Sequence, residues 1–483
     1  SFFLDRSTTC NMLSFSAKVD EPTTVRLWRL LVMVAGAGAL AAAVYRVPAW
    51  LAIWTPGFVA ATVAAAAALL VLAFAVALQG SARAVERVAL EIVFLTFALM
   101  AGEAILLGRS PELWSDDSLA QRVIARERAA LRQGVDFDER LRPDVIDELR
   151  ARGLDAVSGV AQTAGTTGVV ASAVLERGLL PLSNASNAYV VECNEGNGYF
   201  QFRSDDLGFN NPPGLAHGPI DIAVVGESFA LGHCVAPSRS AVELLRARHP
   251  RTANFGVAGS RVLSQLGVMR EYVQPLRPPL VLWFVNTNFA EPRQEADQPL
   301  LTSYLDDPAY SQHLRERAHE VDAFIREVLV PLNRSGAEEL REELDVASRF
   351  PLERLFKMKE LRSLLDFGPA ARRAPPAPDL SHFQRALEQA SSSVQAWGGR
   401  LVVVILPSYE ISTGLKLNNA RYEAVRNIVA ASTAGVVDGV ALFAAQPDYA
   451  SLYTLRIDNH PNAQGHALIA AALLTEVEHE EGK

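Results

Sequence analysis

The chain has 483 residues, of which 49% are hydrophobic, and its formal net charge is −9. This length leaves room for two or three domains, and the acidic balance argues against a nucleic-acid partner. The sequence holds only 3 Cys and no CxxC pair, so a structural zinc site is not expected.

The apolar residues are concentrated in the first quarter of the chain. Uncharged or nearly uncharged stretches run from Leu30 to Tyr45, from Val47 to Ala82 and from Val88 to Leu107. Each approaches or exceeds the ~20 residues that a helix needs to cross a bilayer. A cleaved signal peptide is the alternative for the first stretch, but three successive spans favour an anchor. We therefore expect a tail at 1–25 and a membrane region at 26–109.

The basic residues predict the orientation of these spans. Three of them, Lys18, Arg26 and Arg29, precede the first span. Two, Arg83 and Arg87, lie between the second and third spans, whereas only Arg46 lies between the first and second. The positive-inside rule then places the N-terminus in the cytoplasm and everything after the third span outside it. The expected location is a bacterial inner membrane with a periplasmic catalytic domain.

The remainder of the chain divides into a membrane-proximal region, 110–188, and a larger domain, 189–483. In the larger domain four short apolar runs predict strands: Ile222–Val225, Thr252–Val257, Leu280–Val285 and Leu401–Leu406. Helical patterns separate them, which predicts an α/β fold with a parallel sheet. The residues at about 298–397 are too many for one crossover helix. They are expected to form a helical insertion that either caps the rim of the sheet or merely packs on its surface.

Small and polar residues follow the ends of the first three strands. Ser228 comes two residues after Gly226, where the first predicted strand ends, and Gly259 and Asn288 follow the next two strands. The carboxyl ends of parallel strands meet at one rim, so these residues should converge. Ser228 at a sharp strand-to-helix turn suits a nucleophile, although a helix-capping serine is the alternative.

The stretch IDNHPNAQGHALIA, 457–470, offers an acid and a base in a loop before the last helix. His460 can accept the proton of a serine, and Asp458 can orient its ring and stabilise the imidazolium. His466 is a rival base, but its place inside a helix favours His460.

Together, Gly226-Glu227-Ser228, Gly259, Asn288 and Asp458-x-His460 resemble the motifs of the SGNH, or GDSL-like, hydrolases. The resemblance extends from about Tyr189 to the end of the chain and includes SDDLGFNNP, NFGVAG and HPNAQGHALIA. It implies a flavodoxin-like three-layer α/β/α sandwich with a Ser-His-Asp triad of Ser228, His460 and Asp458. It also implies an oxyanion hole made by the backbone N–H groups of Ser228 and Gly259 and the side-chain amide of Asn288.

Three positions depart from the pattern of this family. Glu227 and Phe289 stand where Asp is usual, and Asp458 precedes His460 by two residues rather than three. The shorter spacing also occurs in related polysaccharide-modifying acyltransferases and esterases, so either reaction remains open. No Gly-rich phosphate loop follows the first strand, and neither a cofactor nor a metal is expected.

These observations predict a membrane-anchored serine esterase or acyltransferase. The expected substrates are an O-acylated glycan or a lipid-linked glycan outside the cytoplasm, and a glycan-assembly membrane protein is a possible partner. The alternative is a catalytically inactive SGNH-like module in such an assembly complex.

Cysteine placement suggests a disulfide in the outer domain. Cys193 lies in the approach to the first strand and Cys234 lies six positions after Ser228, whereas Cys10 falls in the predicted tail. An oxidising compartment allows a Cys193–Cys234 bridge. Two buried free thiols are the alternative.

The predicted orientation can be tested with reporter fusions. A reporter fused after Gly80 should be active in the cytoplasm, and one fused at Asp116 should be active outside it, because the basic residues around Arg83 retain their loop in the cytoplasm. Alkaline phosphatase and a fluorescent protein, fused at both positions, measure the two sides. Identical readouts at Gly80 and Asp116 would contradict a third span.

Overall fold

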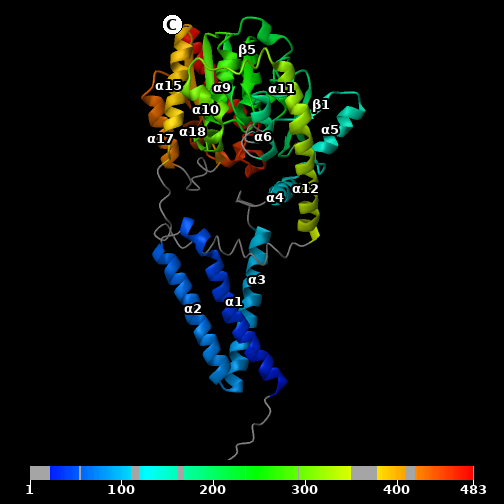
Figure 1. Ribbon diagram of the computed structural model, residues 1–483, viewed down its shortest axis with the longest axis vertical. Helices are drawn as coiled ribbons and strands as arrows, with labels where there is room; N and C mark the ends of the chain where they lie inside the picture. Colours follow the sequence, from blue (N-terminus) through cyan, green and yellow to red (C-terminus); the bar gives the residue numbers. More distant parts are fainter. Residues whose placement is uncertain are drawn as a thin grey trace, which may run out of the picture. The chain divides into compact units, whose positions relative to one another are not determined.

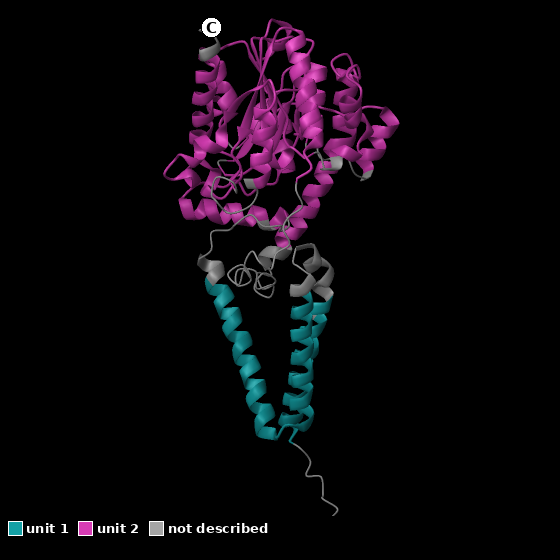
Figure 2. Ribbon diagram, turned by 90° about the vertical axis from the view of Figure 1, so that its left-hand side faces the viewer, with its two compact units in different colours: residues 1–110, 351–375 teal, residues 111–350, 376–483 magenta. Residues whose placement is uncertain are grey.

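The computed structural model describes residues 22–53, 56–109, 119–160, 168–196, 198–233, 235–291, 293–349, 378–409 and 419–481 (Figure 1). The chain forms two compact units, which Figure 2 colours separately. Unit 1 comprises residues 1–110 and 351–375, and unit 2 comprises residues 111–350 and 376–483.

The described part of unit 1 consists of three long helices, α1 (Thr23–Ile53), α2 (Pro56–Gln79) and α3 (Ala82–Arg109). Each contains a stretch long and apolar enough to cross a membrane: Thr23–Ala41, Val59–Gln79 and Ala82–Ile105. The prediction of three apolar spans near the N-terminus is therefore confirmed.

A small apolar cluster packs the described helices of unit 1 against one another. Val32, Ala77 and Ala89 are buried where α1 meets α2 and α3. By contrast, Leu78, Phe94 and Phe97 are 69%, 74% and 71% exposed. Large apolar side chains on the outside of a helix bundle suit a lipid environment, where no water penalises their exposure.

A five-stranded parallel sheet forms the centre of unit 2. Its strands are β4 (Ile222–Gly226), β5 (Thr252–Gly256), β6 (Leu280–Asn286), β7 (Arg400–Leu406) and β8 (Gly435–Asp438). Their spatial order is β5-β4-β6-β7-β8, and every neighbouring pair is parallel. This is the flavodoxin-like order of a doubly wound fold, and the predicted α/β class is confirmed.

Alternate residues of the strands enter two separate cores. On β6, Val281, Trp283 and Val285 join one apolar cluster, whereas Leu282 and Phe284 join another. Both clusters are buried because helices cover both faces of the sheet, which gives three layers.

The helices on the two faces are drawn in Figure 1. One face carries α9 (Val262–Val268, continued by a π-helical turn to Val273), α10 (Pro299–Asp306), α11 (Ala318–Phe324), α15 (Ser381–Ala396) and α17 (Asn419–Ala430). The other face carries α7 (Ser228–Leu231), α8 (Ala241–Arg246), α18 (Gly439–Ala444) and α19 (Ala463–Glu481).

The region expected to be a separate membrane-proximal segment belongs to unit 2. It supplies α4 (Leu119–Gln133), α5 (Arg142–Ala151), β1 (Ala156–Ser158) and α6 (Gly168–Arg177). Strand β1 pairs in parallel with β2 (Tyr189–Asn194), which pairs in turn with antiparallel β3 (Tyr199–Arg203). The boundary expected at residue 188 therefore corresponds to no boundary between compact units.

The predicted insertion at 298–397 is largely part of the helical layers. Leu301, Tyr304 and Phe324 are fully buried in the core beside the sheet, and α15 packs against β7 and α9. A further helix, α12 (Val330–Arg349), contacts α4, α5 and β1. Residues 350–377 lie outside the described residues, so capping of the rim by that part of the insertion stays a prediction.

The close approach of β5 to the turn after β4 depends on Gly256. A Cβ atom at this position would lie 2.5 Å from the Leu231 backbone nitrogen and 2.8 Å from the Ala230 carbonyl carbon. Real Cβ atoms do not approach backbone so closely, so α7 could not sit against β5 if residue 256 had a side chain.

Gly256→Ala should lower the free energy of unfolding by about 1–3 kcal/mol, since α7 must move away from β5. Gly336→Ala is the matched control, because a Cβ on this glycine of α12 meets no atom within 4 Å. Alanine favours a helix interior by up to about 1 kcal/mol, so this control should be neutral or stabilising. Denaturant unfolding of the detergent-solubilised proteins measures both. Equal stability of the two variants would contradict the close approach.

Candidate active site

Ser228 lies at a sharp turn between the central strand and a short helix. β4 ends at Gly226, and Ser228 is the first residue of α7. Its side chain is buried, and its Oγ lies 2.7 Å from Nε2 of His460. The structure thus brings together two residues that are 232 positions apart in the chain.

His460 lies in the loop that precedes α19, and Asp458 lies beside it. The Asp458 Oδ1 atom is 3.2 Å from His460 Nδ1, and it also accepts a 3.1 Å hydrogen bond from the His460 backbone N–H. Ser228, His460 and Asp458 therefore form a connected chain of contacts. In such an arrangement the histidine can take the serine proton and the carboxylate can hold the ring.

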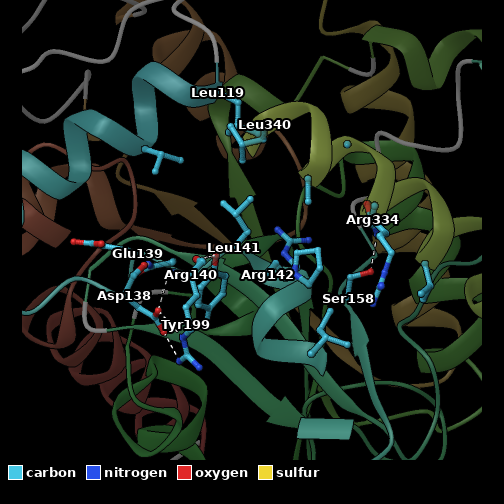
Figure 3. A pocket seen from close by; sticks show the side chains of 18 of the residues that line it. Leu119, Asp138, Glu139, Arg140, Leu141, Arg142, Ser158, Tyr199, Arg334 and Leu340 are labelled. Carbon is cyan, nitrogen blue, oxygen red and sulfur yellow. Dashed lines mark hydrogen bonds and ion pairs between the residues drawn. The ribbon is translucent and has the colours of Figure 1, made fainter. Parts of the chain in front are cut away.

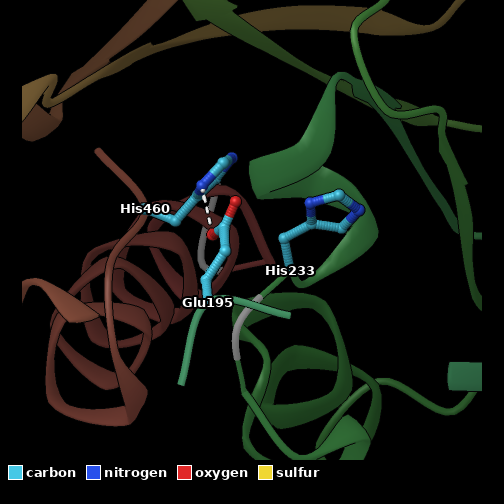
Figure 4. A group of neighbouring side chains, drawn as sticks. All are labelled: Glu195, His233 and His460. Atoms are coloured by element: carbon cyan, nitrogen blue, oxygen red, sulfur yellow. Dashed lines mark ion pairs between the residues drawn. The ribbon is translucent and has the colours of Figure 1, made fainter. Parts of the chain in front are cut away.

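A second carboxylate, which the sequence did not indicate, lies closer to the same ring nitrogen. Glu195 Oε2 is 2.7 Å from His460 Nδ1, and Figure 4 shows the Glu195 side chain directed at the His460 ring. Glu195 follows β2, in the turn between β2 and β3. The sequence does contain a signal for the turn that carries Glu195, because Gly196 and Gly198 follow it closely. In the structure both glycines adopt positive φ.

Arg126 of α4 links the two carboxylates. Its Nε donates to Asp458 Oδ2 at 2.9 Å, and its Nη2 donates to Glu195 Oε1 at 3.0 Å. One guanidinium thus serves both acids with its fork of donors. The sequence signal is weak: Arg126 lies three residues after Val123 and three before Ala129, on the apolar stripe of an amphipathic helix.

These charges determine the ionisation of the site. Burial opposes charge on His460, but the charges and hydrogen bonds of Glu195 and Asp458 outweigh it and raise the pKa of His460 well above its usual range. Burial would likewise raise the pKa of Glu195, but the charges of His460 and Arg126 outweigh burial and hold that pKa well below its usual range. The site is thus built to favour an imidazolium next to a carboxylate.

Glu227 contacts Ser228 from the other side. Its Oε2 accepts a hydrogen bond from Ser228 Oγ, and its side chain is buried. Burial raises the pKa of Glu227 despite the nearby charges of His460 and His233. The glutamate that stands where aspartate is usual in the family therefore contacts the Ser228 hydroxyl directly.

The predicted oxyanion donors follow three adjacent strands. Ser228, Gly259 and Asn288 come after β4, β5 and β6, which are neighbours in the sheet. Arg421 of α17 donates from Nη1 to Asn288 Oδ1 at 3.2 Å. This contact identifies the acceptor end of the Asn288 amide, and the NH₂ group at its other end carries the donor hydrogens.

Phe289, which departs from the family pattern, helps to fix the loop after β6 that carries Asn288. The Arg261 guanidinium lies over its ring, 4.4 Å from the centroid. The same guanidinium donates from Nη1 to the backbone carbonyls of Asn288 and Glu291 at 3.1 and 3.2 Å. Arg261 and the Phe289 ring thus secure the loop in a different way from an aspartate.

The rival base, His466, lies elsewhere. It is buried in α19, and its Nδ1 accepts a 3.2 Å hydrogen bond from the Ala241 backbone N–H at the start of α8. Burial lowers the pKa of His466 to about 4. This residue joins two helices and stays neutral, whereas His460 contacts Ser228.

Three side chains form the group most suited to a metal among the described residues. Ligand atoms of Glu195, His233 and His460 lie within 4.8 Å of one another (Figure 4). Glu195 Oε2 and His460 Nδ1 already contact each other at 2.7 Å, and the Arg126 guanidinium paired with Glu195 would repel a cation. We therefore assign the group to proton chemistry.

A cavity of about 300 Å³ lies between α4, α5 and α12 (Figure 3). It is lined by apolar residues such as Leu141 and Leu340 and by arginines such as Arg140 and Arg142. Arg126 belongs to its described lining, but Ser228 and His460 do not. The cavity thus reaches Arg126, which pairs with Glu195 and Asp458 behind His460, rather than Ser228.

The proposed disulfide lies outside the described residues. Cys234 and the side chain of Cys193 are not described, so the Cys193–Cys234 bridge stays a prediction.

Comparison with known proteins finds similarity to solved structures alone. No family model and no curated protein matches the chain. Solved structures with some similarity include a two-domain esterase active on acetylated mannans (11% identity, TM-score 0.29), covering 56% of this chain and 52% of that one. The match thus spans about half of that esterase.

Two further solved structures are covered almost completely. A putative lipolytic protein of the G-D-S-L family from Desulfitobacterium hafniense has 11% identity and a TM-score of 0.29, with 52% of this chain and 96% of that chain covered. A lipase/acylhydrolase from Enterococcus faecalis has 13% identity and a TM-score of 0.32, with 54% and 96% covered. These scores are low, so the functional argument rests on the geometry of the site.

The buried His466 predicts a stability that depends on pH. Its pKa is about 4 in the folded chain and ordinarily near 6.5, so below pH 6.5 the unfolded state binds a proton that the folded state does not. Stability should therefore fall as the pH decreases from 6.5 to 4, by up to about 3 kcal/mol from this residue.

His466→Gln tests this, because glutamine can accept from the Ala241 N–H but does not titrate. The variant should lose about 2 kcal/mol less than the wild type between pH 7 and pH 5, measured by denaturant unfolding. Parallel stability curves for the two proteins would contradict a neutral, buried His466.

Proposed function

We propose that this chain is a membrane-anchored serine esterase or acyltransferase that acts through an acyl-enzyme on Ser228. The observation that carries the proposal is the contact series from Ser228 Oγ to His460 Nε2 and from His460 Nδ1 to Asp458 and Glu195. A nucleophile, a base and an acid that holds the base are the groups that acyl transfer needs.

Acylation begins when Ser228 Oγ attacks the carbonyl carbon of an ester. The serine proton passes to His460 Nε2, which is already within hydrogen-bond distance at 2.7 Å. The resulting imidazolium faces the carboxylates of Glu195 and Asp458, which stabilise its charge. Only neutral His460 can accept this proton, and its raised pKa therefore favours activity at alkaline pH.

The negative charge that develops on the carbonyl oxygen requires fixed donors. The backbone N–H groups of Ser228 and Gly259 and the Asn288 NH₂ group are the proposed set. Arg421, by binding Asn288 Oδ1, keeps the amide in one orientation and polarises it. Donors that are fixed beforehand need no reorganisation in the transition state.

Collapse of the tetrahedral intermediate breaks the bond to the alcohol, which takes the proton from His460. The acyl group is now an ester of Ser228. His460, again neutral, removes a proton from the acceptor that attacks this ester. The second tetrahedral intermediate then collapses by breaking the bond to Ser228 Oγ, which takes that proton from His460. Water as acceptor gives hydrolysis, and a sugar hydroxyl gives acyl transfer.

The proposed location sets the class of substrate. Three helices are long and apolar enough to anchor the chain, and the basic residues favour unit 2 on the outer side of the membrane. An O-acylated glycan, or a lipid-linked glycan close to the membrane, is the substrate proposed. A lipid or a short-chain ester is the second choice.

The competing function is an inactive SGNH-like module in a glycan-assembly membrane complex. A fluorophosphonate probe distinguishes the two, since it reacts only with an activated serine. Labelling of Ser228 supports an enzyme, and its absence supports the inactive module.

Ser228→Ala and His460→Ala should abolish turnover of a small activated ester, because each removes a reacting group. Asn288→Ala should lower kcat by about a hundredfold, the usual effect of losing one oxyanion donor. His217→Ala, at an exposed histidine paired with Asp206, is the control and should retain activity. Wild-type turnover by Ser228→Ala would refute the nucleophile. Released acetate, compared with acetylated acceptor from a defined glycan, separates hydrolysis from transfer.

A further inference from the structure

The ring of His460 faces two carboxylates with a single nitrogen. Nδ1 lies 2.7 Å from Glu195 Oε2 and 3.2 Å from Asp458 Oδ1. One N–H cannot make two strong hydrogen bonds, and a charge-assisted bond of this kind is strongest at about 2.7–2.9 Å. The distances therefore favour Glu195 as the acceptor of the Nδ1 proton.

Asp458 is engaged in other contacts. Its Oδ1 accepts from the His460 backbone N–H at 3.1 Å, and its Oδ2 accepts from Arg126 Nε at 2.9 Å. Its own backbone N–H donates to the Thr454 carbonyl at 3.0 Å. These contacts fix the loop that carries His460, which is a different task from stabilising the ring.

The charges of Glu195, Asp458 and Arg126 lead to the same assignment of roles to the two carboxylates. Two carboxylates and one guanidinium, all buried, leave a net charge of one negative unit next to His460. One carboxylate thus balances Arg126, and the other is available to balance an imidazolium. Glu195 has the shorter contact with the ring, and Asp458 contacts Arg126 through an oxygen that the ring does not use.

We propose that Glu195, rather than Asp458, is the carboxylate that orients and stabilises the imidazolium of His460, while Arg126 holds Asp458 in the loop. Glu195 is therefore a positioning residue that α4 and the β2–β3 turn bring to the catalytic pair. This inference rests on the proposed function, because it assigns a role within the same reaction.

Other charged and titratable groups face His460 from each side and must be considered. Glu227 precedes α7, His233 follows it with its ring centroid 5.4 Å from that of His460, and His466 lies in α19. His233 is in turn 3.8 Å from Glu192 of β2. Glu195 and Asp458 lie at 2.7 and 3.2 Å from His460 Nδ1, and burial and these two carboxylates are the main influences on the pKa of His460.

The signs of the expected shifts follow from charge. Loss of a carboxylate destabilises the imidazolium, lowers the pKa of His460 and moves the acid limb of kcat/KM to lower pH. Loss of the Arg126 cation does the opposite. Because Glu195 makes the shorter contact, its loss should shift the limb further than the loss of Asp458.

The experiment uses the full-length protein with Glu195→Gln, Asp458→Asn and Arg126→Gln. Glu195→Gln should move the acid limb down by about one pH unit or more and lower kcat by about a hundredfold, with KM little changed. Asp458→Asn should give a smaller shift and about a tenfold loss. Arg126→Gln should move the limb upward. Glu192→Gln makes the same change in β2, three residues before Glu195 and near His233, so it is the matched control and should move the limb least.

The Nδ1 proton provides a spectroscopic readout that a merely structural role would not change. A far-downfield proton resonance from the Nδ1–H of the imidazolium, observed at low pH, should be lost in Glu195→Gln and retained in Asp458→Asn. Any other pattern in these two variants overturns the assignment. If Glu195→Gln does not fold, Glu195→Asp replaces it: the charge remains but the carboxylate is withdrawn, so the resonance must move upfield and kcat must fall.

Failure of this inference differs from failure of the proposed function. A wild-type protein whose Ser228 does not react with a fluorophosphonate refutes the function itself. A wild-type protein that reacts, together with a resonance that depends on Asp458 and not on Glu195, refutes only the role of Glu195.

Discussion

The buried ion pairs of Arg126 with Glu195 and Asp458 constrain the rest of unit 2. All three side chains are at most 9% exposed, and a buried charge without a partner costs several kcal/mol. Arg126 comes from α4, Glu195 from the β2–β3 turn and Asp458 from the loop before α19. The small sheet and α4 must therefore pack onto the five-stranded sheet for all three of these charges to be satisfied. This explains why residues 119–188 belong to the same compact unit as the nucleophile.

A second buried acid, Glu295, fixes the backbone at the start of α9. Glu295 accepts hydrogen bonds from the backbone N–H groups of Arg261 and Leu263 and from Ser264 Oγ, at the start of α9. Burial raises its pKa to about 6. The segment that follows Gly259 is thus held by a carboxylate, and Arg261 in turn holds the loop of Asn288. The proposed oxyanion donors depend on buried polar contacts rather than on apolar packing alone.

The sequence predicted those parts of the molecule that local patterns determine. Runs such as Leu280–Val285 are apolar and rich in β-branched residues, so β6 was recognisable, whereas β8 has only four residues and was missed. Ser228 and His460 were recognisable because each lies in a motif. Glu195 and Arg126 were not, because their importance comes from contacts across 69 to 332 positions. The pairing of β1 with β2 across the expected boundary at residue 188 is long-range in the same way, since a helix and a loop separate the two strands.

The spacing of Asp458 and His460 gives a physical reason for a second carboxylate. An aspartate readily binds the backbone N–H two residues later, and Asp458 does so with His460. The Oδ1 atom that makes this bond is the one nearest to Nδ1, so the acid cannot also approach the ring closely. A spacing of three residues would place the carboxylate and the backbone N–H differently. With a spacing of two, Asp458 stabilises the loop, and the ring requires an acid from elsewhere in the fold, which the β2–β3 turn supplies in Glu195.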